Sequence, residues 1–236
     1  MAMRLGITRS AEQLRDLAVK AASRGITIVP LPVIETRSLD FCWPEELVES
    51  PDWVVVSSAA GVRAFMEGCS KLKRTDYLDF TYAAIGDKTA EVLRNANISP
   101  RVVSSRAEGQ ALFEELVAWY VLPDQTLLYA RGAEISYDPT DLLASSQIRY
   151  FPVICYETVP LEVERAVVDS FSSNDYVLFT APSAVRTFHR QFGIPKMRTI
   201  AMGNTTAMEM AQLGWPTPLF LTLPDVSTVL EQLACI

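Results

Sequence analysis

The sequence has few of the residues on which zinc and imidazole chemistry depend. Its only histidine is His189, whose neighbours Arg190 and Gln191 suggest an exposed helix end. Its cysteines, Cys42, Cys69, Cys155 and Cys235, lie far apart. Zinc sites use short spacings between Cys or His ligands, and a serine-type triad needs a histidine beside its nucleophile. We therefore expect no metal site and no histidine-based triad. In a chain of this size and setting a disulfide framework is also not expected, and we interpret the cysteines as free thiols.

The sequence also lacks a positive excess and long hydrophobic runs. Lys and Arg total 21 against 28 Asp and Glu, which gives a net charge of -7 at pH 7. Such a chain has no overall basic field that would attract nucleic acid. No apolar run approaches the roughly 20 residues of a membrane helix, and the N-terminus has no apolar core of signal-peptide length. We expect a cytoplasmic protein with neither a nucleic-acid nor a membrane partner.

Sequence signatures of nucleotide binding are missing as well. No Gly-x-Gly-x-x-Gly follows an expected strand, and no Gly-x-x-x-x-Gly-Lys-Ser/Thr occurs anywhere. Both motifs bring phosphates onto backbone N–H groups at the start of a helix. Their absence disfavours a nucleotide-dependent enzyme.

Short apolar runs alternate with helical patterns along the whole chain. Strands are expected at residues 3–7, 26–29, 53–56, 82–85, 101–103, 126–130, 176–180 and 198–202. Helices are expected at residues 10–24, 61–69, 88–96, 111–120, 183–192, 206–213 and 226–233. This alternation predicts an α/β fold with two domains, each a parallel sheet flanked by helices.

An internal repeat runs through this pattern. DWVVVSSAAGVRAF at 52–65 returns as DYVLFTAPSAVRTF at 175–188, with Asp, an aromatic residue, an apolar run and Val-Arg-x-Phe at matching positions. AIGDKTAEVL at 84–93 returns as AMGNTTAMEM at 201–210. Upstream of the first copy lie Thr8-Arg9 and PVIET at 32–36. They match Ala130-Arg131-Gly132 and PVICYET at 152–158, upstream of the second copy. Each half therefore contains the same series of strands and turns.

The turns of the repeat are rich in small and hydroxyl residues. In α/β sheets, turns after the carboxyl ends of strands form the mouth of the binding crevice. Asp87 and Asn204 are candidate N-caps after Gly86 and Gly203, and the start of a helix attracts anions. Each such turn alone is also typical of ordinary capping, but their recurrence in both halves favours a cleft. An acidic chain can therefore still bind a carboxylate-rich ligand.

The ordered set of motifs resembles one known family over nearly the whole chain. Thr-Arg, Pro-Val-Ile-Glu, VSSAAGVRAF, AIGDKTA, Arg-Gly, PVICYET, FTAPSAV and AMGNTTA occur in the order typical of uroporphyrinogen-III synthases. The resemblance implies that the chain leaves its first domain, builds the second and returns. It implies a first domain at 1–33 and 159–236, a second at 37–151, and linkers at 34–36 and 152–158.

The resemblance also implies a reaction. Members of this family cyclise hydroxymethylbilane, a linear tetrapyrrole with eight carboxylates, to uroporphyrinogen III without a cofactor. Loss of the hydroxymethyl oxygen as water gives an azafulvene, and ring D is inverted through a spiro intermediate. The protein must fold the substrate, assist the leaving oxygen and exclude water. The implied molecule is a monomer that makes transient contact with the preceding pathway enzyme.

Carried over by position, the resemblance gives a set of site residues. Tyr156 is the implied proton donor, because a phenol with an ordinary pKa near 10 stays protonated at working pH. Its alternative role is that of an aromatic side chain packed between domains. Ala181 stands where many members have Ser, so no side-chain hydrogen bond is possible there. The implied substrate-binding residues are Arg9, Ser57, Ser58, Gly86, Thr89, Arg131, Gly132, Ser183, Gly203, Thr205 and Thr206.

A second class of function fits the same architecture. A two-lobed α/β binding protein for a carboxylate-rich small ligand would show the same plan without catalysing a reaction. Product isomers formed from hydroxymethylbilane would distinguish the two possibilities.

Overall fold

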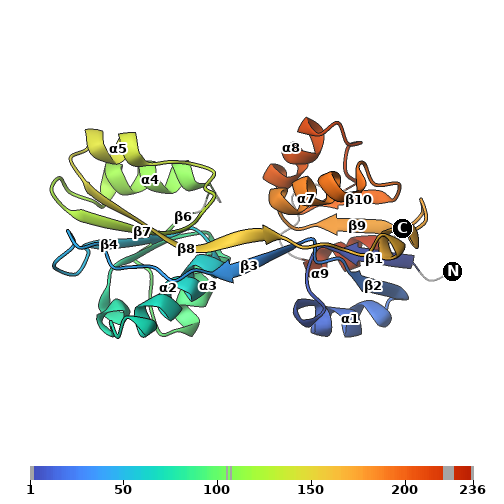
Figure 1. Ribbon diagram of the computed structural model, residues 1–236, viewed down its shortest axis with the longest axis horizontal. Helices are drawn as coiled ribbons and strands as arrows, with labels where there is room; N and C mark the ends of the chain where they lie inside the picture. Colours follow the sequence, from blue (N-terminus) through green and yellow to red (C-terminus); the bar gives the residue numbers. More distant parts are fainter. Residues whose placement is uncertain (1–2, 105, 107, 220–225, 235–236) are drawn as a thin grey trace. The chain divides into compact units, whose positions relative to one another are not determined.

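The computed structural model describes residues 3–104, 106, 108–219 and 226–234 and divides the chain into two compact units (Figure 1). Unit 1 comprises Met1–Glu35 and Val159–Ile236, and unit 2 comprises Thr36–Thr158. The chain therefore leaves unit 1, builds the whole of unit 2 and returns to complete unit 1.

Unit 2 contains the greater part of a six-stranded sheet with the order β3-β8-β7-β4-β5-β6. Its strands are β3 (Ile34–Ser38), β4 (Trp53–Val56), β5 (Tyr82–Ile85), β6 (Val102–Ser104), β7 (Thr126–Gly132) and β8 (Arg149–Pro160). Its helices are α2 (Ala59–Lys71), η2 (Asp76–Asp79), α3 (Asp87–Asn95), α4 (Gly109–Trp119) and α5 (Thr140–Ser145). The pairs from β8 through β7, β4 and β5 to β6 are parallel.

Helices cover both faces of this sheet, as Figure 1 shows, with α2 and α3 on one face and α4 and α5 on the other. Val54 and Val56 of β4 pack with Phe65 of α2 in one buried cluster. Trp53 and Val55 of the same strand belong to the opposite cluster, which includes α4 and α5 residues. Because successive side chains of a strand point to opposite faces, a strand that is buried on both faces reads as a continuous apolar run.

Unit 1 contains a four-stranded parallel sheet with the order β10-β9-β1-β2. Its strands are β1 (Met3–Ile7), β2 (Ile26–Pro30), β9 (Tyr176–Phe179) and β10 (Arg198–Ala201). Its helices are η1 (Glu12–Leu14), α1 (Arg15–Ala22), α6 (Arg165–Asp169), α7 (Pro182–Phe192), α8 (Asn204–Gln212) and α9 (Val226–Leu233). The α1 and α9 residues share a core with one face of the sheet, and α7 and α8 cover the other.

The strand order confirms the internal repeat. The order β2-β1-β9-β10 in unit 1 matches β8-β7-β4-β5 in unit 2, although the chain visits these strands in a different sequence. Ile7 pairs with Pro30 in unit 1, and Tyr129 pairs with Pro152 in unit 2. Pro30 therefore corresponds to Pro152, and the alignment of PVIET with PVICYET, which matched Pro32 to Pro152, is wrong.

The predicted elements are confirmed with shifts at their ends. The helix expected at 10–24 begins as the short 3-10 helix η1 and becomes α-helical only at Arg15. The sequence analysis did not predict α5, α6 or η2, which are short. Residues 34–36 lie in β3 and 152–158 in β8, and Pro152 to Tyr156 pair with β7.

The buried and exposed aromatic residues of α4 allow a test of core packing. Phe113 is 0 % exposed, and its ring meets the Tyr129 ring edge-on with their centroids 5.1 Å apart. We expect Phe113→Ala to lower the free energy of unfolding by about 3–5 kcal/mol, because the cavity cannot close fully. Trp119 on the same helix is 80 % exposed, and Trp119→Ala should change the free energy by less than about 0.5 kcal/mol. Urea unfolding followed by circular dichroism measures both, and equal losses would contradict this packing.

Candidate functional site

In each unit the chain reverses its direction across the sheet between two neighbouring strands. In unit 2 these strands are β7 and β4, and in unit 1 they are β1 and β9. Ligands of open α/β sheets bind outside the carboxyl ends of the strands at such a point. The expected site residues that follow these strand ends are Arg9, Ser57, Ser58 and Ser183, and Arg131 and Gly132 lie at the end of β7. The glycines and threonines of the two Gly-x-x-Thr turns follow the next strands, β5 and β10. Each unit therefore has one candidate edge.

In unit 2, the serine after β4 connects a helix to the tyrosine of β8. Ser58 is the N-cap of α2, and its Oγ accepts a hydrogen bond from the backbone N–H of Gly61 at 3.0 Å. The same Oγ lies 3.0 Å from the hydroxyl oxygen of Tyr156, and either hydroxyl can donate. The phenol is therefore held at the start of a helix, where the helix dipole is positive.

The ring of Tyr156 lies against Gly132 at the end of β7. A methyl group on Gly132 would lie 2.8 Å from Cζ and 3.1 Å from the hydroxyl oxygen of Tyr156. Gly132 pairs with Tyr156 across an irregularity, because the preceding Arg131 pairs with Ile154 and Cys155 is passed over. This β-bulge turns Tyr156 toward Gly132, as bulges commonly do beside functional sites.

Arg131 supplies a cation at the same edge. One of its terminal nitrogens donates to the backbone oxygens of Gly132 at 3.1 Å and Ala133 at 3.4 Å. Its Nε is buried without a hydrogen-bond partner. The side chain is half-buried, and its permanent charge suits a carboxylate at this edge.

Two further tyrosines of this edge were missed by the sequence analysis. Burial raises the pKa of Tyr129, and a hydrogen bond with Ser57 opposes part of that shift. Burial also raises the pKa of Tyr150, and the charge of Arg131 opposes it. Both side chains stay protonated and can act only as neutral hydrogen-bonding groups. Tyr129 lies on a strand that was expected at 126–130, whereas no strand was expected at Tyr150. The nearness of Tyr129 to Ser57 and of Tyr150 to Arg131 was not predictable.

In unit 1, two threonines close the corresponding edge. Thr8 Oγ1 accepts from the backbone N–H of Thr180 at 3.0 Å and lies 3.2 Å from Thr180 Oγ1. Arg9 follows directly, and partial burial lowers the pKa of its guanidinium, which still stays protonated. Ser183 lies in the first turn of α7, after Ala181, which is the N-cap and has no side-chain cap hydrogen bond. The sequence analysis did not include Thr8 and Thr180 among the site residues, although both follow strand ends.

The two Gly-x-x-Thr turns begin α3 and α8. Gly86 and Gly203 are the N-caps, with φ of 74° and 88°, a region that favours glycine. The prediction that Asp87 and Asn204 are N-caps is therefore wrong, because each is the first residue of its helix. The first backbone N–H groups of each helix have no partner within the helix.

The threonines of these turns face the protein interior. Thr89 is 4 % and Thr206 is 1 % exposed, and Thr206 donates its hydroxyl to the backbone oxygen of Met202 at 3.0 Å. Thr205, next to Thr206, is exposed, as are Lys88 and Asn204 in the same turns. The exposed side-chain donors of these turns are therefore Lys88, Asn204 and Thr205.

The lone histidine and the cysteines belong to the structural framework. His189 is half-buried and its Nδ1 accepts from Trp215 Nε1 at 2.9 Å, so the prediction of an exposed residue is wrong. Cys42, Cys69 and Cys155 are free thiols, as predicted, whereas Cys235 lies outside the described residues. Within the described ranges no group of three or more His, Cys, Asp or Glu side chains could hold a metal. None of the helices in the described part of the chain has the length and apolarity of a membrane span.

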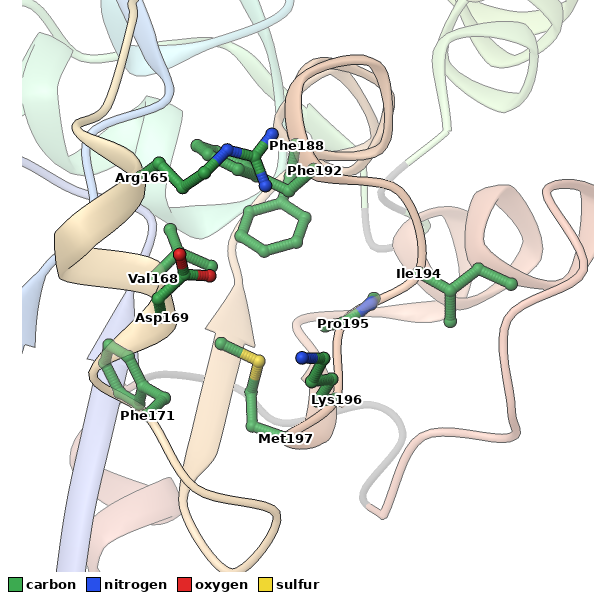
Figure 2. Close-up of a pocket in the computed structure, with 10 residues that line it drawn as sticks. All are labelled: Arg165, Val168, Asp169, Phe171, Phe188, Phe192, Ile194, Pro195, Lys196 and Met197. Carbon is green, nitrogen blue, oxygen red and sulfur yellow. The ribbon is translucent and has the colours of Figure 1, made fainter.

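A separate cavity lies at the opposite edge of the unit 1 sheet (Figure 2). It measures about 290 Å³ and is lined by Phe171, Phe188 and Met197, with Arg165 and Lys196 at its margin. Phe171 and Met197 precede β9 and β10, so the cavity lies at the amino ends of these strands. It is therefore distinct from the edge that carries Arg9 and Ser183.

Comparisons with known proteins agree on one family. A model described as uroporphyrinogen-III synthase HemD matches residues 15–226. Uroporphyrinogen-III synthetase from Helicobacter pylori superposes with a TM-score of 0.68 at 18% identity, over 99% of this chain and 99% of its own. A mutant uroporphyrinogen III synthase from Thermus thermophilus gives 0.66 at 18% identity, over 98% and 96%. No curated protein sequence matches the chain significantly.

The threonine pair of unit 1 predicts a measurable loss of stability. Thr8→Val removes the acceptor for the backbone N–H of Thr180, and a buried group without a partner costs about 1–3 kcal/mol. We expect that loss in the free energy of unfolding, measured in urea. Thr8→Ser keeps the hydroxyl and should recover most of it. Undiminished stability of Thr8→Val would contradict this role of the hydrogen bond.

The thiols predict a pattern of alkylation. Burial raises the pKa of Cys69 and of Cys155 to about 12, and the thiolate is the reactive form. At pH 8 we expect iodoacetamide to modify the exposed Cys42 in the native protein and to leave the two buried thiols intact. Peptide mass spectrometry measures this, and the same reaction in urea is the control. Modification of Cys69 or Cys155 in the native state at the rate of Cys42 would contradict it.

Proposed function

This chain belongs to the uroporphyrinogen-III synthase family, the cyclising lyases of tetrapyrrole biosynthesis, and we propose how its residues act on the linear tetrapyrrole. The observation that carries the proposal is the Tyr156 hydroxyl, held 3.0 Å from Ser58 Oγ at the start of α2. It is a neutral proton donor at the end of the sheet where α/β proteins bind ligands.

Each edge offers charged and uncharged donors to substrate carboxylates. Arg131 in unit 2 and the partly desolvated Arg9 in unit 1 provide the cations. The first backbone N–H groups of α3 and α8, after Gly86 and Gly203, provide neutral donors aligned with a helix dipole. Ser57, Ser183 and Thr205 add hydroxyl groups, whereas the Ser58 hydroxyl is engaged by Tyr156 and by the backbone N–H of Gly61. Thr89 and Thr206 contribute through the helix starts that they help to fix, because their side chains are buried.

Tyr156 assists the departure of the hydroxymethyl oxygen. As the bond from carbon to oxygen breaks with its electron pair, the phenol donates its proton and water leaves. Ring D attacks the resulting azafulvene through its substituted carbon, and the spiro intermediate reopens and closes with ring D inverted. The proton released at the final closure returns to the phenolate. The phenolate formed when water leaves is therefore the base of the last step, and no other base is needed.

We propose further that the chain acts as a monomer in the cytoplasm, where it receives its substrate by transient contact with the preceding enzyme. Hydroxymethylbilane closes by itself to the unrearranged type I ring. Rapid capture therefore protects the yield of the type III isomer. The family relationship supports the substrate, and the sequence analysis supports the compartment.

Substitution of the tyrosine tests the mechanism. Tyr156→Phe keeps the ring against Gly132 and removes only the hydroxyl. General-acid catalysis contributes about 10²- to 10⁴-fold, and we expect turnover to fall within that range. Type III should remain the enzymatic product, because the bound conformation decides which carbon attacks.

The measurement is a rate and an isomer ratio from one reaction with hydroxymethylbilane, after the uncatalysed closure is subtracted. Trp119→Ala, on the exposed side of α4, is the control and should react like the unaltered protein. Undiminished turnover in Tyr156→Phe would remove this residue from the mechanism. If the unaltered protein formed only type I at the uncatalysed rate, the proposed function itself would fail.

A further inference from the structure

The two candidate edges share their anion-binding residues. Arg9 in unit 1 corresponds to Arg131 in unit 2. Arg9 comes just after β1, and Arg131 lies at the carboxyl end of β7. Gly203 corresponds to Gly86, and both are N-caps with positive φ. The duplicated architecture therefore repeats the parts that suit a carboxylate.

The edges differ at four positions that meet at one side chain. The strand register that pairs Ile7 with Pro30 and Tyr129 with Pro152 fixes the correspondence along this part of the repeat. Continued without a gap, it also aligns the shared Glu-Thr at 35–36 with that at 157–158. Unit 2 has Ser58, Gly61, Gly132 and Tyr156 where unit 1 has Ala181, Ala184, Ser10 and Ile34.

The two glycines leave the space that the tyrosine ring occupies. A methyl group on Gly132 would lie 2.8 Å from Cζ and 2.9 Å from Cε2 of Tyr156, closer than such carbons approach. A methyl group on Gly61 would lie 3.4 Å from Cε1 of Tyr156 and 3.3 Å from Ser58 Oγ. Gly132 is therefore essential for this ring position, and Gly61 contributes a smaller clearance.

The serine fixes the hydroxyl of the same ring. Ser58 Oγ is itself held by the backbone N–H of Gly61 at 3.0 Å, so it is a fixed partner for Tyr156 at 3.0 Å. Ser58 and Tyr156 are 98 residues apart in the chain. In unit 1 the corresponding Ala181 offers no such contact, and Ile34 offers no hydroxyl.

We call Ser58, Gly61, Gly132 and Tyr156 the tyrosine slot. We propose that the first three are positioning residues that act through Tyr156. Unit 2 alone is then the source of the proton. Unit 1 carries the repeated anion-binding residues and none of the four slot residues. The inference rests on the proposed function, because it assigns the slot to the same reaction. The inference goes beyond the proposed function because it gives Gly132 and Ser58 a role that precedes any contact with substrate.

Double mutants test whether the slot acts through the hydroxyl. Gly132→Ala should lower turnover about as much as Tyr156→Phe, within about 10²- to 10⁴-fold, and Gly61→Ala should lower it less. Ser58→Ala should also lower turnover, and Ser58→Thr should restore most of it because the hydroxyl returns. In the Tyr156→Phe background, each of these substitutions should change turnover by less than about twofold, since the shared step is already lost.

Gly6→Ala is the matched control. A methyl group on Gly6 would lie 2.6 Å from Cδ1 of Leu31, so it strains unit 1 without touching Tyr156. We expect it to lower the thermal midpoint and to have the same effect on turnover in the unaltered and Tyr156→Phe proteins.

A second readout needs no substrate. With tyrosine labelled at ¹³Cζ, the resonance of Tyr156, assigned from its loss in Tyr156→Phe, reports the surroundings of the hydroxyl. We expect Ser58→Ala and Gly132→Ala to shift it, and Gly6→Ala to leave it in place.

The outcomes separate the two proposals. If Gly132→Ala lowers turnover equally in both backgrounds, Gly132 acts on the substrate directly and the slot proposal is overturned. An unshifted resonance in Ser58→Ala and Gly132→Ala would also overturn it. If the unaltered protein forms no type III product, the proposed function fails, and a shifted resonance still shows that the slot holds the phenol.

Discussion

The pairing of β7 with β4 is the contact on which the unit 2 site depends. It brings together residues from distant parts of the chain, because Trp53 lies opposite Leu127 and Val56 opposite Ala130. Parallel strands end at the same edge, so the turns after them converge. The pairing of β1 with β9 does the same in unit 1, where Thr8 and Thr180 meet across the two strands. Each candidate edge therefore depends on the register of one strand pair, β7 with β4 in unit 2 and β1 with β9 in unit 1.

Much of the fold was predictable because both faces of each sheet are buried. Residues 53–56 and 82–85 read as short apolar runs and form β4 and β5. The glycine turns were also predicted, but the N-cap of α3 is Gly86 and not Asp87. Gly86 has a φ of 74°. A sequence shows that a glycine is present without showing whether it caps or precedes the helix.

The candidate site residues were named from the sequence, but the contacts among them were not predictable. Tyr156 and Ser58 are 98 residues apart, and no local pattern indicates that their hydroxyl groups meet. The bulge that places Tyr156 opposite Gly132 depends on how β8 pairs with β7, which periodicity does not specify. The burial of Thr206 was likewise hidden, because its hydroxyl bonds to the backbone one turn earlier, at Met202.

Duplication accounts for the division of labour between the edges. Binding many carboxylates requires repeated donors, and a repeated fold supplies them at equivalent strand ends. The departure of one oxygen requires a single proton donor in a fixed place. A second tyrosine at the position of Ile34 would have Ser10 where Tyr156 has Gly132. It would also lack a hydroxyl partner, because Ala181 stands where unit 2 has Ser58. Changing Ile34 alone would therefore not give unit 1 a positioned proton donor.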